Sequence, residues 1–305
     1  MAMAATLRSY LELVRFSHTV FALPFAIMAG LIAASVDASD HPGQPAWHWL
    51  RLALGILACM VTARTAAMAF NRLVDREIDA RNPRTIGRHI PAGLLGVGEV
   101  TLLVAVSAGL FVAATLLFLP NWLPVALAVP VLAWLLGYSY AKRFTPLAHL
   151  WLGAALGLAP LAAWIAVRGP AILADPADLM PAVVLAAAVT TWVAGFDTIY
   201  ACQDVGFDAA EGLQSLPSRF GVAGALRIAA GLHLVTVLLL AALPAVTPGL
   251  GGITWATVAA IAGLLAYEHA LVRPDDLSRV NQAFFMVNAV IGALLLAAIG
   301  LDLWL

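Results

Sequence analysis

Charged side chains are scarce in this chain, and cysteines are scarcer still. Only 11% of its 305 residues are Asp, Glu, Lys or Arg, and the mean hydropathy is +0.94. A soluble domain has about 25% charged residues, so the composition excludes an ordinary soluble protein. Two isolated cysteines support neither a disulfide framework nor a zinc site. We expect no nucleic-acid partner, no obligate protein partner and no cleavable signal.

Long apolar runs define the predicted fold. A helix needs about 20 apolar residues to cross a bilayer, and the chain has nine such runs. They lie near 17–36, 47–70, 97–119, 121–140, 146–167, 179–200, 222–244, 252–272 and 282–303. Only Pro120-Asn121 separates the third run from the fourth. The sequence therefore predicts an all-α polytopic membrane protein, a bundle of nine transmembrane helices in one domain over residues 1–305.

The basic residues predict how the bundle is oriented. All 16 except Arg51, Arg64 and Arg168 lie before the first span or after an even-numbered one. Cytoplasmic loops carry the excess of Lys and Arg. We therefore expect a cytoplasmic N-terminus, an extracytoplasmic C-terminus and residence in a bacterial inner membrane, in contact with its lipids.

Two acidic runs interrupt the apolar sequence, after the second and sixth spans. They read Asn71-xxx-Asp75-xxx-Asp79 and Tyr200-xxx-Asp204-xxx-Asp208. Residues four apart share one face of a helix, so each run is expected to direct two carboxylates the same way. Carboxylates near hydrocarbon usually have a binding partner, and hard divalent cations are the simplest one. Arginine and lysine on the same membrane face would neutralise a phosphate, so the pattern suits a metal–diphosphate complex.

These runs resemble the two signatures of the UbiA superfamily of intramembrane prenyltransferases. The matching segments are Asn71-Arg72-Leu73-Val74-Asp75-Arg76-Glu77-Ile78-Asp79 and the stretch from Asp197 to Asp208. The positions of Arg15, Arg64 and the segment Tyr138-Ser139-Tyr140-Ala141-Lys142-Arg143 are also similar to family positions. The family's quinone-pathway members often have Asp directly after the first Asn, where this chain has Arg72.

The resemblance implies a Mg²⁺-dependent transfer of a polyprenyl group from its diphosphate to an aromatic acid, within a single UbiA-like domain. It implies metal ligands at Asn71, Asp75, Asp79, Asp204 and Asp208, the four aspartates and Arg143 also being the catalytic set. It implies substrate contacts from Arg15, Arg64, Asn71, Lys142, Tyr138, Asp197 and Tyr200. The acceptor would be of the 4-hydroxybenzoate type, in quinone biosynthesis.

The physical chemistry agrees with that reaction. A prenyl tail dissolves among helices while its diphosphate stays at the polar end, so the active site is expected at the cytoplasmic ends of the spans. An allylic cation must be protected from water. Aromatic residues near that level are candidate ring faces for the tail or the cation, although packing is the commoner role for each. They are Phe21, Phe25, Phe70, Trp134, Tyr138, Trp192, Phe196 and Tyr200.

Three other functions remain open. Prenylation of a dihydroxynaphthoate for menaquinone would use the same motifs, and so would transfer to homogentisate, haem or chlorin acceptors. A cation-coupled transporter would also place carboxylates in a bundle, but nearer mid-membrane. A CDP-alcohol phosphotransferase uses clustered aspartates too, but its compact single motif is absent from this sequence.

Overall fold

The computed structural model describes residues 10, 12–13 and 23–305, and the described residues are almost entirely helical. The long helices are α2 (Leu23–Asp40), α3 (Ala46–Arg81), α4 (Val97–Thr115), α5 (Leu123–Ala141), α6 (Ala148–Ala174), α7 (Met180–Ala201), α9 (Leu216–Val246), α10 (Gly252–Leu271) and α12 (Asn288–Trp304). Short helical turns connect some of them: η2 (Leu116–Phe118), η3 (Pro176–Leu179), η4 (Cys202–Asp204), α8 (Val205–Ala210), α11 (Val280–Gln282) and η5 (Ala283–Val287). The predicted all-α class is confirmed.

Eight helices of the described part are long and apolar enough to cross a membrane. Helix α10 occupies the predicted eighth span but is not one of these eight, since Tyr267, Glu268 and His269 lower its mean hydropathy. The chain turns at Pro120-Asn121 as predicted, between η2 and α5. Other predicted ends are wrong by several residues: α3 continues through Arg81, and α6 continues past a kink at Arg168 to Ala174. Pro170 is tolerated there because it follows the kink, in the first turn of a new helical segment.

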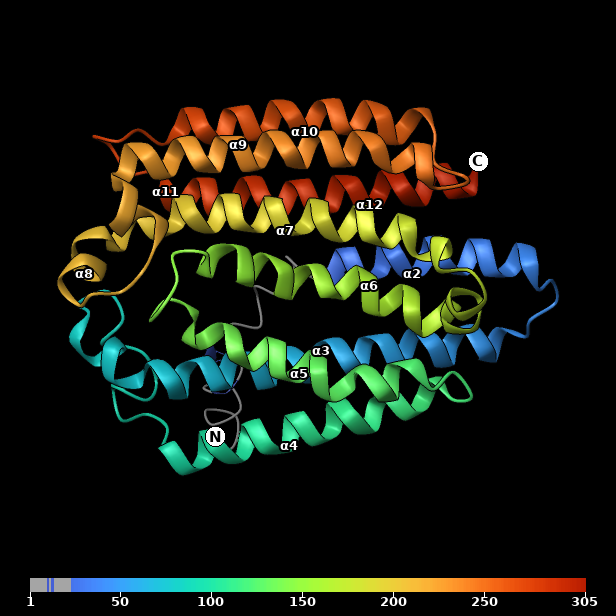
Figure 1. Cartoon of the computed structure of the whole chain (residues 1–305), viewed down its shortest axis with the longest axis horizontal. Helices are drawn as coiled ribbons and strands as arrows, with labels where there is room; N and C mark the ends of the chain where they lie inside the picture. Colours follow the sequence, from blue (N-terminus) through green and yellow to red (C-terminus); the bar gives the residue numbers. More distant parts are fainter. Residues whose placement is uncertain (1–9, 11, 14–22) are drawn as a thin grey trace, which may run out of the picture. The chain divides into compact units, whose positions relative to one another are not determined.

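The helices form two compact units. Among the described residues, unit 1 contains 10, 12–13 and 50–140, and unit 2 contains 23–49 and 141–305. Unit 1 therefore holds α3 from Leu50 onward, with α4 and α5 (Figure 1). A buried cluster joins these three helices through Ala66, Phe111, Ala128 and Leu132. Large apolar side chains elsewhere on α4 and α5 face outward, as lipid-facing surfaces do.

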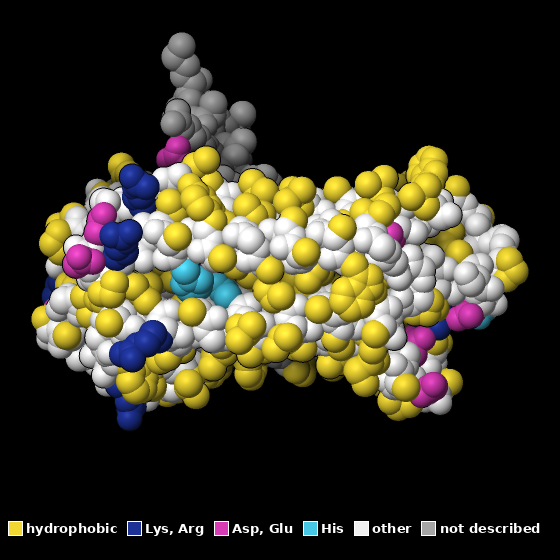
Figure 2. Space-filling model, turned by 90° about the horizontal axis from the view of Figure 1, so that it is seen from above, with side chains coloured by type: hydrophobic (Ala, Val, Ile, Leu, Met, Phe, Trp, Pro, Cys, Tyr) yellow, Lys and Arg dark blue, Asp and Glu magenta, His cyan; other side chains and the backbone are white. Residues whose placement is uncertain are grey.

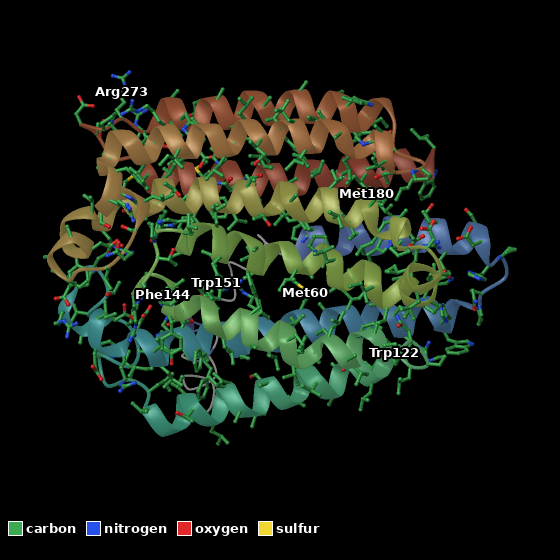
Figure 3. The ribbon with its side chains drawn as sticks, in the orientation of Figure 1. Met60, Trp122, Phe144, Trp151, Met180 and Arg273 are labelled. Carbon is green, nitrogen blue, oxygen red and sulfur yellow. The ribbon has the colours of Figure 1, made fainter. Side chains whose placement is uncertain are left out.

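Unit 2 is built around α7, which packs most extensively against α6 and α9. Gly153 and Gly157 of α6 allow the close approach, because a Cβ at either position would collide with Thr190 or Ala186 of α7. Small residues four apart are the usual means by which membrane helices come close. In Figure 3, Phe144 precedes α6 at one end of unit 2 and Met180 starts α7 at the other, so the two helices run antiparallel.

The outer face formed by α9 and α10 has the polarity of a membrane protein. Figure 2 shows hydrophobic side chains along its middle, with most of the arginine and lysine at one end and acidic side chains at both ends. The arginines that follow the sixth and eighth predicted spans, Arg219, Arg227, Arg273 and Arg279, all belong to this unit. This charge distribution is what the positive-inside rule requires of one membrane face.

Candidate functional site

The first acidic motif lies on an uninterrupted helix. Asn71, Asp75 and Asp79 all fall within α3, one turn apart, so the predicted shared face is present. Asn71 Nδ2 donates a 3.2 Å hydrogen bond to Asp75 Oδ2. Asp75 and Asp79 are only 2% and 4% exposed, although they stand at the polar end of the helix. The motif therefore presents closely spaced, shielded oxygen atoms.

The loop that follows α3 folds back on this motif. Arg88 Nη1 donates to both carboxylate oxygens of Asp79, at 2.7 and 2.8 Å. Thr85 Oγ1 donates to the Asp79 carbonyl oxygen at 3.1 Å, and Thr85 is 3% exposed. The sequence predicts Asp79 as a metal ligand and treats Arg88 as an orienting charge. In the structure the two form an ion pair, and the predicted metal contact of Asp79 stays a prediction.

Further predicted residues of unit 1 lie on the same helix and on α5. Arg64 sits two turns before Asn71, and Tyr138 of α5 is near enough to act on it electrostatically. Arg72 is 6% exposed, and its Nη1 lies 3.5 Å from Asn71 Oδ1. Arg15 lies outside the described residues, so its predicted substrate contact remains a prediction.

The second acidic motif is not one continuous helix. Helix α7 ends at Ala201, the 3₁₀ turn η4 contains Asp204, and the short helix α8 contains Asp208. The backbone of Asp204 (φ −101°, ψ 4°) leaves the α-helical region, so the simple one-face geometry expected from the spacing is wrong here. Asp204 and Asp208 nevertheless remain within electrostatic range of each other.

Polar side chains from three segments of unit 2 surround this motif. The side chains of Lys142, His149 and Ser215 also lie near Asp208. His149 Nδ1 lies 2.7 Å from Asp197 Oδ2. The Gln214 backbone N–H donates to the Lys142 carbonyl oxygen at 2.6 Å, which joins the two loops. Lys142, Asp197 and Asp208 therefore lie in one polar cluster with His149.

Sequence reasoning missed two members of this cluster. His149 is 5% exposed and pairs with Asp197. Ser215 also caps α9, where its side chain accepts from the Ser218 N–H. Nothing in the spacing could have identified either, since 48 residues separate His149 from Asp197. Arg143 is exposed beside Lys142, and Tyr200 stacks on Phe284 at the end of α7.

The donors suit a hard cation. Carboxylate and amide oxygens are the ligands that Mg²⁺ prefers, and Mg²⁺ commonly uses only one or two carboxylates together with waters and substrate phosphates. Within the described residues no group of three or more His, Cys, Asp or Glu is arranged to hold a metal alone. Each motif instead offers a few carboxylates with a cation beside them, Arg88 in one and Lys142 in the other.

Comparison with known proteins agrees with these features. The model of the UbiA prenyltransferase family matches residues 19–290. A 4-hydroxybenzoate octaprenyltransferase from Sodalis glossinidius is 32% identical over 257 residues, covering 82% of this chain and 84% of that protein. The apo structure of a UbiA homolog from Aeropyrum pernix K1 is 34% identical, with a TM-score of 0.80 over 94% of this chain and 98% of that one.

The fold also extends to more distant proteins. A UbiA homolog from Archaeoglobus fulgidus bound to DMAPP and Mg²⁺ has a TM-score of 0.70 at 19% identity, covering 97% of this chain and 99% of that one. The family is one of enzymes, so the transporter considered from the sequence is wrong. This helical membrane protein belongs to the UbiA prenyltransferase family.

Proposed function

We propose that this protein transfers a polyprenyl group from polyprenyl diphosphate to an aromatic acid of the 4-hydroxybenzoate type, in a Mg²⁺-dependent reaction of quinone biosynthesis. The observation that carries the proposal is a cation beside the carboxylates of each motif: Arg88 is paired with Asp79, and Lys142 lies near Asp208. That combination suits a metal–diphosphate complex, which needs oxygen ligands for the ion and cations for the remaining phosphate charge. The similarity to a 4-hydroxybenzoate octaprenyltransferase, at 32% identity, supports an acceptor of this class.

Most of the predicted residues have a role in this proposal. Asn71, Asp75 and Asp79 of unit 1, and Asp204 and Asp208 of unit 2, would be ligands of Mg²⁺, which when bound acts as a Lewis acid toward the diphosphate leaving group. Lys142 and Arg143 would neutralise phosphate oxygens. The bound DMAPP and Mg²⁺ of the Archaeoglobus homolog support a prenyl diphosphate and Mg²⁺ as the ligands.

The protein then has to orient the acceptor and exclude water. The phenol oxygen raises electron density at the ortho ring carbon, so that carbon can take the prenyl group. The allylic C–O bond breaks, a C–C bond forms, and the ring loses one proton. Holding the ring beside the allylic carbon supplies much of the rate. A carboxylate on the acceptor would pair with Arg64 or Arg15.

Orientation follows from the charges. The positive-inside rule supports placing both motifs at the cytoplasmic face of the inner membrane, with the C-terminus extracytoplasmic. The diphosphate donor would then enter from the cytoplasmic side, while its tail lies among the helices.

The test is an acceptor panel with one long prenyl diphosphate and purified protein in proteoliposomes. We expect Mg²⁺-dependent turnover of 4-hydroxybenzoate and none of benzoate, which lacks the activating hydroxyl. Faster turnover of a dihydroxynaphthoate carboxylic acid would replace the proposed acceptor by that of menaquinone biosynthesis. Prenylation of homogentisate or haem alone would contradict an aromatic-acid acceptor of the benzoate type.

A further inference from the structure

Three helices of unit 2 share a buried polar contact that the proposed reaction does not use. Trp192 of α7 donates its indole N–H to Asn288 Oδ1 of α12 at 2.7 Å, and Asn288 Nδ2 donates to Glu268 Oε1 of α10 at 3.2 Å. Glu268 and Asn288 are 0% exposed, and Trp192 is 2% exposed. Polar groups in such a position are costly unless they are hydrogen-bonded. This polar trio (Trp192, Asn288, Glu268) therefore fixes α7, α10 and α12 to one another.

Asn288 also secures an irregular turn. It directly follows η5 (Ala283–Val287), a π-helical turn in which the backbone carbonyls lose their normal i+4 donors. Its Nδ2 atom reaches two of these carbonyl oxygens, Phe284 O at 3.1 Å and Ala283 O at 3.3 Å. π-Helical turns are uncommon and often occur at functional sites. The side chains that this turn positions are therefore of interest.

The turn places Phe284 against the second acidic motif. Phe284 is 8% exposed, and its ring centroid lies 4.4 Å from that of Tyr200 and 5.2 Å from that of Phe196. Phe196 in turn lies 5.0 Å from Trp192. Trp192, Phe196 and Tyr200 are spaced four apart on α7, so they share one face of it. These three rings and Phe284 form a continuous aromatic column.

The column joins the polar trio to the metal-binding motif. Tyr200 is the first residue of Tyr200-xxx-Asp204-xxx-Asp208, and α7 ends one residue later. The backbone at Asp204 has left the α-helical region, so regular helix geometry alone does not fix where its carboxylate points. Packing at the end of α7 must supply that constraint.

We propose that Asn288 is a positioning residue for the second aspartate motif, acting through the π-helical turn, Phe284 and Tyr200. It touches neither the substrate nor the metal in this role. It sets the end of α7 from which Asp204 and Asp208 extend, and thereby the affinity for a Mg²⁺–prenyl diphosphate complex. The inference rests on the proposed function only in taking that complex as the ligand of the motif.

The test measures binding and does not depend on turnover. Titration calorimetry of purified protein with geranyl thiodiphosphate, a slowly reacting donor analogue, gives its Kd at several Mg²⁺ concentrations. For Asn288→Ala we expect a Kd at least about tenfold weaker, with a higher Mg²⁺ concentration needed for half-saturation. In turnover assays KM for the prenyl diphosphate should rise while KM for the acceptor stays within about twofold.

Control variants separate positioning from simple loss of stability. Thr236→Val removes another interhelical bond of α7, the 2.8 Å contact between Thr191 Oγ1 and Thr236 Oγ1, and should lower the melting temperature without changing Kd. Glu268→Gln keeps the oxygen that accepts from Asn288 and should bind as the wild type does. If Asn288→Ala does not fold, Phe284→Leu decides the matter, because it leaves the polar trio intact and removes the ring that stacks on Tyr200.

Two results would overturn the inference: an unchanged Kd for a folded Asn288→Ala, or an unchanged Kd for Phe284→Leu. Failure of the proposed function gives a different result. In that case the wild type would bind the analogue with Mg²⁺ yet prenylate no aromatic acid. The ratio of the Kd of Asn288→Ala to the Kd of the wild type would still test the role of Asn288. A wild type that does not bind the analogue at all would overturn both.

Discussion

Arg88 Nη1 lies 2.7 and 2.8 Å from the two carboxylate oxygens of Asp79, so a loop guanidinium neutralises the last aspartate of the first motif. The Asp79 side chain is 5% exposed and that of Arg88 is 21% exposed. A shielded carboxylate that loses its partner is left with an uncompensated charge. The contact therefore ties the loop after α3 to the motif.

Replacing Arg88 with Ala should destabilise unit 1 by about 2 kcal/mol, the typical cost of losing hydrogen bonds to a charged group. The loop from 82 to 96 should also become more sensitive to protease. Thermal unfolding in detergent and limited proteolysis measure the two effects. Arg84→Ala, a change at an exposed position of the same loop, is the matched control and should alter neither. A double-mutant cycle with Asp79→Asn that gave a coupling below about 0.5 kcal/mol would show that the pair does not hold the loop.

Asp75→Asn and Asp204→Asn should each reduce turnover by about 100-fold or more, because each removes a charged oxygen ligand while keeping side-chain size. Loss of turnover in each of the two single variants would show that both motifs are required. Chelation should stop the wild-type reaction and added Mg²⁺ should restore it. Glu77→Gln changes an exposed acid within the first motif that pairs with Arg76, and it should remain active. Full activity in excess chelator would contradict the metal assignment.

Arg64→Ala should raise KM for the aromatic acid about tenfold and leave KM for the prenyl diphosphate nearly unchanged. The expected reason is loss of a charge-assisted hydrogen bond to the acceptor carboxylate. Steady-state kinetics with each substrate varied in turn gives both constants. Arg51→Ala, on the same helix but 13 residues earlier, is the control. Equal rates for acceptors with and without the carboxylate would remove the basis for this role. Arg15→Ala tests the same idea at a position outside the described residues.

A reporter fused after Leu305 should be extracytoplasmic, whereas single cysteines placed between Arg81 and Arg88 should react only with cytoplasmic reagents. Both follow from the excess of basic residues on one side of the membrane. Cys59 and Cys202 are free thiols and should first be replaced by Ala. A cytoplasmic C-terminus would mean that the long helices do not all cross the membrane. Helix α10, which is not among the eight apolar spans, would then be the first candidate for a helix that does not cross it.

Arg168→Leu should destabilise unit 2 by about 2 kcal/mol, because it removes the hydrogen bonds of a buried guanidinium to partly exposed carboxylates. Arg168 is 4% exposed, and its Nη2 lies 2.6 Å from Asp178 and 2.9 Å from Asp40, while Nη1 lies 3.6 Å from Asp37. This cluster joins α2, α6 and η3 at the opposite end of α6 from His149. Thermal unfolding should show the loss, while KM for both substrates stays unchanged in the folded enzyme. Arg227→Ala, at an exposed position of α9, should have no such effect.

Sequence alone was sufficient for the class, the helices and the first motif. An apolar run of about 20 residues crosses a bilayer as a helix, because a helix satisfies all its backbone hydrogen bonds internally. The chain turn at Pro120-Asn121 lies where composition predicted it. Asn71, Asp75 and Asp79 share a face because their spacing and an uninterrupted helix are local properties. Helix ends were less predictable, since α3 and α6 extend beyond their apolar runs.

The tertiary structure decided which distant side chains meet. Asp79 pairs with Arg88, His149 with Asp197, and Asn288 with Trp192 and Glu268, and none of these contacts has a signature in spacing. The second motif shows the limit most clearly, because its i, i+4 pattern predicted a helical face that the break at Asp204 removes. Local propensity determines the secondary structure of each segment. Which buried polar groups satisfy one another depends on how helices from separate parts of the chain pack, and only the folded chain determines that.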